Sequence, residues 1–369
     1  MSQEIDRLSF EKIFYQKDHL DQLLTIGEAY PIHLDLGLVN YCNHDCTFCY
    51  AKRSMFDSMG VPRQRIEIGR LMEIIEEMAG LGLKSVTLVG SGEPTLHPQT
   101  HQIIAGIHER GVEVGIFTNG SGLRPDVNQA LVEHCKFVRF SLTGASRRVH
   151  DIVHANGDYE KILGNICQLV EFRGARRFPT LGIQFVLASY SAEDVVRGAE
   201  QARDLGVDYY EIKPVFPSVG KTDQLPNTLA SEDAITLMME AKKYETPSFK
   251  VYAKSDQLKG AYANIDDRIY DDCPGCRTST TLESDFKLYI CDNQKAPQYC
   301  FGNLGEQSFE EVWNGNQRKE ILEFLNVHKC PPHCRMDPLN VIIQQIRNGD
   351  LVVPEKLEAP DEDIHPNFL

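Results

Sequence analysis

Nine of the eleven cysteines in this 369-residue chain fall into two groups that are far apart in the sequence. Three lie within residues 42–49, and six lie within residues 273–334. Closely spaced thiolates bind zinc or iron–sulfur clusters in reducing compartments, whereas disulfides form in oxidising ones. The spacing therefore indicates two metal-binding regions, if the protein stays in a reducing compartment.

The rest of the composition favours the cytoplasm as that compartment. The N-terminus has no basic segment followed by an apolar one, and no apolar run approaches the length of a membrane span, so no membrane partner is expected. The formal net charge of −15 argues against nucleic acid as a partner, because binding phosphates requires clustered Lys and Arg.

The first cysteine group comprises Cys42, Cys46 and Cys49, with the spacing C-x3-C-x2-C. A [4Fe–4S] cluster normally takes four thiolates, so three thiolates in one loop would leave one iron open to another ligand. The alternative is a zinc site in which His44 is the fourth ligand. The position of the group directly after a predicted strand favours the cluster.

From residue 32 onward, short β-branched runs alternate with longer stretches of helical period, which is typical of parallel βα units. Six such units could form a partial barrel or an open doubly wound sheet. Polar or glycine-rich segments follow nearly every strand, as in barrels that carry their chemistry there, which favours an α/β fold with a partial (β/α)6 TIM-like barrel. The expected strands are residues 32–39, 85–90, 112–118, 137–142, 181–187 and 209–213.

Four segments are expected along the chain. Residues 1–31 form an N-terminal extension with one amphipathic helix around residues 14–24, and residues 32–246 form the barrel. Residues 266–346 form a small, loop-rich α+β domain that contains the second cysteine group, and residues 347–369 form a surface tail. The two remaining cysteines, Cys135 and Cys167, are expected to be buried on the outer helices.

The first cysteine group, with the aromatic residue Phe48 before its last cysteine, resembles the C-x3-C-x-aromatic-C signature of the radical S-adenosylmethionine (SAM) superfamily. Residues 91–94, Ser-Gly-Glu-Pro, resemble the family's GGEP motif, with serine in place of the first glycine. Asn119 and Ser141 also lie where the family contacts its cofactor. The residues that the resemblance assigns to cofactor binding are Tyr50, Ser91, Gly92, Glu93, Pro94, Asn119 and Ser141.

This resemblance implies a reaction and a set of cofactors. S-adenosylmethionine would coordinate the open iron, and an electron from the reduced cluster would cleave it and release a 5′-deoxyadenosyl radical. An external electron donor such as flavodoxin or ferredoxin would supply that electron.

The second cysteine group resembles the SPASM or twitch extensions of radical SAM enzymes, which bind auxiliary [4Fe–4S] clusters. The resemblance rests on Cys276-Arg277, on residues 288–291 and 302–304, on the Ser308–Trp313 segment and on a final C-x3-C. It implies one cluster held by Cys276, Cys291, Cys330 and Cys334, with Cys273 as a possible replacement for Cys276. Cys300 would be an inert thiol, and a zinc ribbon is the alternative.

The favoured hypothesis is hydrogen abstraction from a small polar substrate, sugar-like or aminocyclitol-like, leading to dehydrogenation, epimerisation or dehydration. Only 31 residues precede the first strand, which favours a small substrate over a peptide that needs a leader-binding domain.

In dehydrogenation the auxiliary cluster would accept an electron, and Asp292 would take the proton or only cap a turn. Glu211 and Lys213 would face the substrate or form a structural ion pair. The alternatives are a peptide or protein maturase, including sulfatase-type maturation, and a non-enzymatic iron–sulfur electron carrier.

Overall fold

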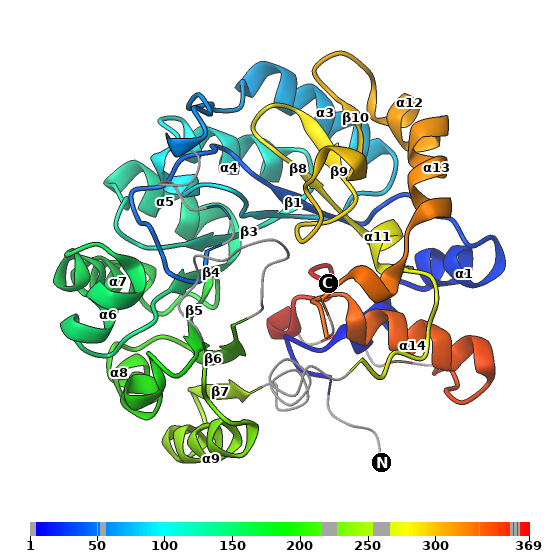
Figure 1. The fold of residues 1–369 in the computed structure, drawn as a ribbon. Coiled ribbons are helices and arrows are strands. Elements are labelled where there is room, and N and C mark those ends of the chain that lie inside the picture. Colours follow the sequence, from blue (N-terminus) through cyan, green and yellow to red (C-terminus); the bar gives the residue numbers. More distant parts are fainter. Residues whose placement is uncertain are drawn as a thin grey trace.

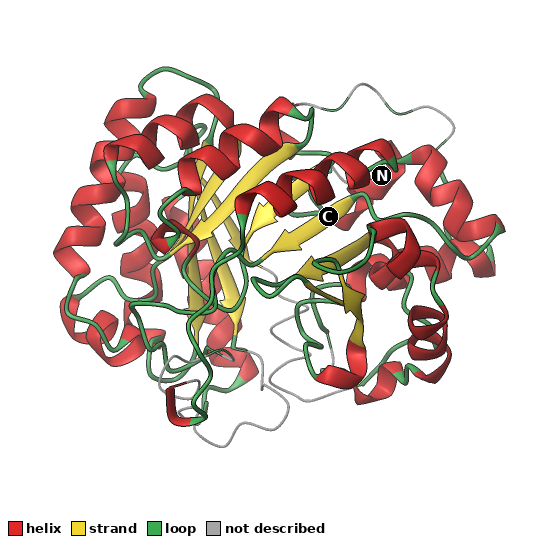
Figure 2. Cartoon of the chain, turned by 90° about the horizontal axis from the view of Figure 1, so that it is seen from above, coloured by secondary structure: helices red, strands yellow, loops and turns green. Residues whose placement is uncertain are grey.

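The computed structural model describes residues 5–49, 51, 57–215, 227–253, 266–331, 333–354, 357, 360 and 362–369. In this part of the chain one ten-stranded sheet runs in the order β10-β9-β8-β1-β2-β3-β4-β5-β6-β7. The sheet curves, and helices cover its outer face (Figure 1, Figure 2). The expected α/β fold with a partial barrel is confirmed.

All six predicted strands are present, with ends that differ by a few residues from the predictions. From β8 through β1 to β7 every neighbouring pair is parallel, whereas β9 pairs antiparallel with both β8 and β10. All residues of β1 and β2 are buried, as expected for parallel strands covered on both faces. The strands are β1 His33–Leu36, β2 Ser85–Leu88, β3 Glu113–Thr118, β4 Cys135–Ser141, β5 Thr180–Leu187, β6 Tyr209–Pro214, β7 Lys250–Ala253, β8 Ser279–Leu282, β9 Lys287–Tyr289 and β10 Cys300–Asn303.

The outer helices bury one apolar face each against the sheet. In α3 the residues Leu71, Ile74, Ile75 and Met78 are at most 1% exposed, and each such side chain contributes about 1.5–3 kcal/mol by burial. The helices are α1 Lys17–Thr25, α3 Ile68–Gly80, α4 Thr100–Glu109, α5 Pro125–His134, α6 Arg147–His154, α7 Tyr159–Arg173, α8 Val195–Asp204, α9 Ser231–Ala241, α11 Gly275–Thr278, α12 Phe309–Asn314, α13 Asn316–Phe324 and α14 Asp337–Asn348. Ser308 and Glu311 form a capping box at the start of α12.

The N-terminal extension contains two short helices instead of the single one expected. A 3-10 helix, η1 (Phe10–Tyr15), is separated from α1 by Gln16. The Gln16 side chain donates to the Pro366 carbonyl at 2.9 Å, so the residue between the two helices contacts the C-terminal segment. Both helices pack with α14 in a second apolar cluster that includes Leu20 and Ile343.

The expectation of a surface tail is wrong for the last residues. His365, Phe368 and Leu369 are at most 7% exposed, and Figure 1 shows the C-terminus in the middle of the curved sheet. The Phe368 ring lies 5.0 Å from that of Phe137 in β4. The acidic and proline-rich composition before residue 364 indicated a solvated tail, but the last apolar residues pack inside the barrel.

The predicted placement of the two lone cysteines is correct only in part. Cys135 is buried as expected, but it is the first residue of β4 instead of lying on an outer helix. Cys167 lies on α7 as expected, but its side chain is exposed because it is on the solvent face of that helix. Within the described residues, no helix has the length and apolar character needed to cross a membrane.

Candidate active site

The loop after β1 carries three cysteines, and backbone N–H groups lie beside the sulfurs of two of them. The backbone N–H of His44 lies 3.4 Å from Cys42 Sγ, and that of Ala51 lies 3.3 Å from Cys49 Sγ. Burial raises the pKa of Cys42 to about 12, so its thiolate forms at neutral pH only with a cationic partner such as iron. Three converging sulfurs with N–H donors fit a cluster that keeps one iron open.

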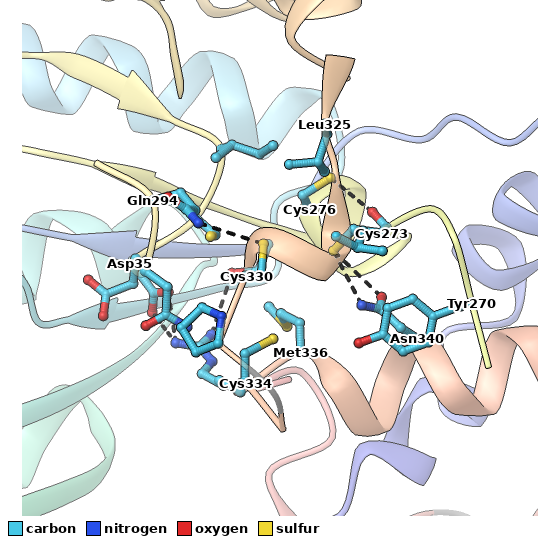
Figure 3. Close-up of a pocket in the computed structure, with 18 residues that line it drawn as sticks. Asp35, Tyr270, Cys273, Cys276, Gln294, Leu325, Cys330, Cys334, Met336 and Asn340 are labelled. Carbon is cyan, nitrogen blue, oxygen red and sulfur yellow. Dashed lines mark hydrogen bonds and ion pairs between the residues drawn. The ribbon is translucent and has the colours of Figure 1, made fainter. Parts of the chain in front are cut away.

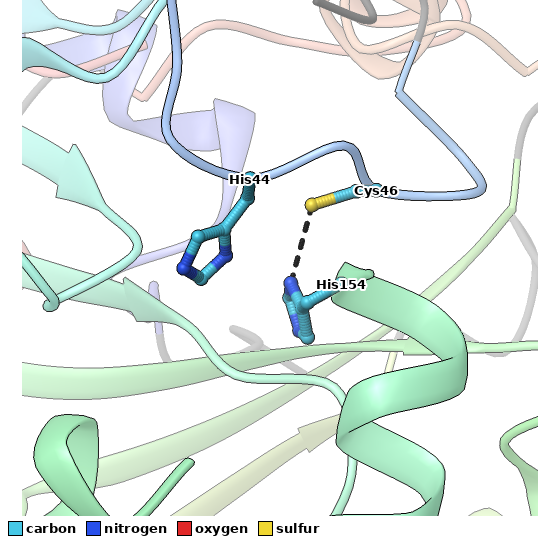
Figure 4. A group of neighbouring side chains, drawn as sticks. All are labelled: His44, Cys46 and His154. Carbon is cyan, nitrogen blue, oxygen red and sulfur yellow. Dashed lines mark hydrogen bonds between the residues drawn. The ribbon is translucent and has the colours of Figure 1, made fainter. Parts of the chain in front are cut away.

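Behind this loop lies a buried group of imidazoles (Figure 4). His44 Nε2 is 3.1 Å from Asp158 Oδ2, and His154 Nδ1 is 3.2 Å from Cys46 Sγ. One nitrogen or sulfur atom from each of His44, Cys46 and His154 lies within 4.8 Å of the others. Burial and the neighbouring imidazoles hold the pKa of His154 well below its usual value, so its ring is neutral.

The turn after β2 packs directly on the cysteine loop. A Cβ on Gly92 would lie 2.4 Å from the Val39 carbonyl oxygen and 2.5 Å from that of Tyr41, so only glycine fits. Glu93 caps the 3-10 helix η2 (Pro94–Leu96) and accepts hydrogen bonds from Thr95, Thr118 and the Asn119 backbone. These contacts tie the turn after β2 to the end of β3, and the Glu93 N–H donates to the Tyr41 carbonyl at 3.1 Å, which joins both to the cysteine loop. A role of Glu93 in cofactor binding stays a prediction.

The other residues expected to contact the cofactor lie near the same loop. Asn119 donates from Nδ2 to Asn43 Oδ1 at 2.9 Å, with Cys42 Sγ 3.8 Å away. Ser141 is half-buried at the last position of β4. Tyr50 lies outside the described residues. Direct contact of Asn119 and Ser141 with the cofactor stays a prediction.

Ser91, which replaces the first glycine of the motif, has a partner in the C-terminal part of the chain. Its hydroxyl donates to Glu283 Oε1 at 3.0 Å, and Lys295 Nζ donates to the same oxygen at 2.7 Å. Lys295 also donates to Asp292 Oδ1 at 2.7 Å. A chain of polar contacts therefore joins the turn after β2 to the second cysteine group.

Five cysteines of that group line one cavity of about 750 Å³ (Figure 3). The sixth, Cys300, lies in β10 and approaches the Gly302 carbonyl instead. The cysteines at the cavity are Cys273, Cys276, Cys291, Cys330 and Cys334. The structure brings together the five cysteines named from the sequence as candidate ligands, one sulfur more than a four-thiolate cluster needs.

Asn340 distinguishes the first two of these cysteines. Its Oδ1 accepts from the Gly275 backbone N–H at 2.8 Å, so its Nδ2 is free to donate to Cys273 Sγ at 3.3 Å. Cys276 Sγ instead donates to the Cys273 carbonyl at 2.9 Å. Cys273 Sγ thus has an N–H donor beside it, as a thiolate ligand does, although its thiol also lies 3.7 Å from Asn340 Oδ1, whereas Cys276 Sγ faces a carbonyl oxygen.

Two ion pairs with a buried carboxylate were not predicted from the sequence. In the first, Arg139 Nη1 lies 2.7 Å from Glu211 Oε2 inside the barrel. The ion pair of Glu211 with Lys213, which was one of the two expectations for these residues, is present, with Lys213 Nζ 3.5 Å from Glu211 Oε1. Arg139 and Lys213 line a second cavity of about 700 Å³. The sequence feature that could have pointed to Arg139 is a charged residue in the middle of a mainly apolar strand.

The second pair joins β1 to the cysteine-rich segment, and in it Asp35 is buried whereas the Arg335 side chain is 35% exposed. Arg335, next to Cys334, contacts both carboxylate oxygens of Asp35, at 3.0 and 2.7 Å. Burial alone would raise the pKa of Asp35, but Arg335 and His33 outweigh it and hold that pKa well below its usual value.

Comparison with known proteins places both cysteine regions in described families. The sequence model of the radical SAM superfamily matches residues 37–174, and that of the SPASM iron–sulfur cluster-binding domain matches residues 273–336. These ranges contain the cysteine loop after β1 and the six cysteines of the second group.

Two relatives align with most of the chain. A protein of Pyrococcus furiosus named as a tungsten-containing aldehyde ferredoxin oxidoreductase cofactor-modifying protein is 25% identical over 324 residues, 82% of this chain and 86% of that protein. The mycofactocin maturase of Mycobacterium ulcerans is 28% identical over 289 residues, 77% of this chain and 74% of the relative.

A solved structure has the same fold at low sequence identity. SuiB of Streptococcus suis bound to S-adenosylmethionine superimposes with a TM-score of 0.68 at 16% identity, covering 90% of this chain and 78% of that one. Its complex with the precursor peptide SuiA gives a TM-score of 0.66.

Proposed function

Since the chain belongs to the radical SAM superfamily and carries a C-terminal SPASM domain, we propose that it oxidises a peptide or protein substrate by radical hydrogen abstraction. Its two cysteine regions bind [4Fe–4S] clusters instead of zinc, and its barrel binds S-adenosylmethionine. When bound, the first cluster and S-adenosylmethionine supply the radical that removes hydrogen from the substrate.

The observation that carries the oxidation is the contact chain Ser91–Glu283–Lys295–Asp292. It runs from the turn at the first cluster site to the residue that follows Cys291, so a substrate bound beside it would be within reach of both regions. A substrate radical becomes an oxidised product when it loses one proton and one electron. Asp292 is the proposed proton acceptor, and the auxiliary cluster is the proposed electron acceptor.

We assign the auxiliary cluster to Cys273, Cys291, Cys330 and Cys334. The Asn340 contact supports Cys273 over Cys276, which replaces the ligand set expected from the sequence pattern. Four thiolates leave no open iron, and this suits electron transfer better than substrate coordination.

The peptide substrate is supported by the relatives. The mycofactocin maturase is named for maturation, as is the sporulation killing factor maturation protein of Bacillus subtilis, which is 25% identical over 212 residues. A barrel of the same fold is known with a precursor peptide bound. The earlier preference for a sugar-like substrate has no comparable support.

The test is transfer of deuterium. Reconstituted protein with S-adenosylmethionine and a low-potential reductant is given peptides encoded beside its gene, deuterated at single side-chain carbons. Deuterium should appear in 5′-deoxyadenosine, and the peptide should lose two hydrogen atoms by mass spectrometry. A panel of deuterated polyols and aminocyclitols serves as the comparison, and deuterium from that panel alone would replace the proposal.

A small polar substrate stays the second candidate because of the barrel interior. Arg139, Glu211 and Lys213 place charges beside the second cavity, where they would orient a compact polar molecule. In either case Glu211 and Lys213 are proposed to position the substrate.

A further inference from the structure

The imidazole of His154 contacts a sulfur of the first cluster site from outside the cysteine loop. Its Nδ1 lies 3.2 Å from Cys46 Sγ, within hydrogen-bonding distance for sulfur (Figure 4). Cys42 and Cys49 receive backbone N–H groups at 3.4 and 3.3 Å, and Asn119 Nδ2 lies 3.8 Å from Cys42 Sγ. The side-chain nitrogen at Cys46 is closer, and it comes from α6. A side chain can be exchanged by mutation where a backbone group cannot.

The backbone of Thr143 determines which ring nitrogen of His154 carries the proton. Thr143 N–H donates to His154 Nε2 at 3.0 Å, so Nε2 must present its lone pair. A neutral imidazole carries one N–H, which therefore lies on Nδ1 and points at Cys46 Sγ. The same argument excludes His154 as a metal ligand. The ring-nitrogen lone pair that could bind a metal is on Nε2, where it accepts the Thr143 N–H and faces away from the cysteine loop.

Backbone hydrogen bonds also fix the position of Cys46 relative to His154. Asp45 N–H donates to the His154 carbonyl at 3.2 Å, and Thr47 N–H donates to the Val153 carbonyl at 2.8 Å. The residues on both sides of Cys46 are thus attached to the last turn of α6. The His154 ring is fully buried and stacks on His150 with centroids 4.7 Å apart, so it has little freedom to turn away.

From this geometry we infer that His154 raises the reduction potential of the first cluster through its hydrogen bond to Cys46. The reduced cluster carries one more negative charge than the oxidised cluster, and that charge is partly on the sulfurs. An N–H donor therefore stabilises the reduced form more than the oxidised form. His154 acts through Cys46, so it is a positioning and tuning residue, and its effect is independent of which substrate the enzyme takes.

The test measures potential, not turnover. His154→Leu removes the donor, whereas His154→Asn keeps an N–H, because Asn Nδ2 lies as many bonds from Cα as His Nδ1. The first-cluster signal in the full-length, doubly loaded protein is identified by the change in its electron paramagnetic resonance spectrum on adding S-adenosylmethionine. Potentiometric titration should show the reduced-to-oxidised ratio of His154→Leu lowered roughly tenfold at a given potential, about 59 mV for a one-electron couple.

The controls separate this hydrogen bond from a general disturbance of the site. His154→Asn should retain most of the wild-type potential, and His150→Phe, which changes the stacked neighbour, should leave it unchanged. A His154→Leu protein that binds the first cluster and keeps the wild-type potential would overturn the inference. So would a shift of equal size in His150→Phe.

A second measurement covers the case in which His154→Leu fails to bind iron. Wild-type protein whose histidines carry ¹⁵N only in the imidazole ring, reduced and examined by electron–nuclear double resonance, should show a ring nitrogen coupled to the first cluster. His154→Asn should lack that coupling while keeping its cluster. Absence of any coupled imidazole nitrogen in the wild type would refute the hydrogen bond directly.

Discussion

At the scale of residues, the cavity at the second cysteine group is lined by five thiols where a cluster needs four, and one asparagine distinguishes two of them. Asn340 donates to Cys273, whereas Cys276 donates to a carbonyl. We therefore expect Cys276→Ala to keep about eight irons per chain, and Cys273→Ala to lose the auxiliary cluster and keep about four. Iron and sulfide analysis after anaerobic reconstitution measures this, and the opposite pattern would restore the ligand set expected from the sequence.

A second residue-scale prediction concerns acid stability. His19 on α1 is buried beside Thr278, and burial, with Lys84, lowers its pKa to about 4. Unfolded, the same side chain titrates near 6.5. Below pH 6.5 the unfolded chain therefore binds a proton that the folded chain does not, so the stability contributed by neutral His19 is complete above that pH and is lost as pH falls towards 4.

Between pH 7.5 and 5.5 this linkage costs about 1 kcal/mol. The apparent melting temperature of wild type should therefore fall more over this interval than that of His19→Gln, whose side chain does not titrate. Equal falls in the two proteins would show that His19 is not linked to unfolding. Control spectra at each pH should confirm that both clusters remain bound.

At the scale of elements, periodicity predicted the six strands from β1 to β6 but not β7 or β8. The β8 segment, Ser-Thr-Thr-Leu, is hydroxyl-rich and lies in a loop-rich region, so nothing local indicates a strand. Its partner is β1, more than 240 residues earlier in the chain. Parallel pairing at such separation leaves no local signal in the sequence. The sequence therefore predicted a separate cysteine-rich domain, whereas in the structure β8 continues the sheet of the barrel.

The Asp35–Arg335 pair joins these distant elements and can be tested by removing one partner or both. Arg335→Met leaves the buried Asp35 carboxylate without its cation and should destabilise the protein by about 3 kcal/mol, lowering the apparent melting temperature by several degrees. Asp35→Asn combined with Arg335→Met removes both charges and should recover much of that loss. If the double variant were no more stable than Arg335→Met alone, the cost would come from lost packing of the arginine stem.

At the scale of the whole molecule, two regions that the sequence separates by more than 200 residues face one barrel. Short motifs identified each cysteine group, because thiolate spacing within a loop is a local property. The contact between Ser91 and Glu283 could not be predicted, since it depends on β8 lying beside β1. The structure thus brings the two cysteine regions into contact, and the proposed steps of radical formation and electron removal can be separated by mutation.

Only the first cluster leaves an iron open, so losing the auxiliary cluster should not prevent cleavage of S-adenosylmethionine. Cys291→Ala combined with Cys330→Ala should still produce 5′-deoxyadenosine but should stop net oxidation of the substrate. The matched control is Cys42, Cys46 and Cys49 changed together to Ala, which should abolish cleavage altogether. Both measurements use chromatography of 5′-deoxyadenosine and product from the same reaction.

Folding must be checked in the double variant, because cluster ligands drawn from residues 273–334 tie distant loops together and metal binding there contributes to stability. Gel filtration and the spectrum of the first cluster provide that check. A folded double variant that still oxidised substrate at the wild-type rate would rule out electron removal through the auxiliary cluster. The substrate radical would then have to be resolved without net oxidation, by epimerisation or dehydration, and the contact chain from Ser91 to Asp292 would serve to hold the substrate.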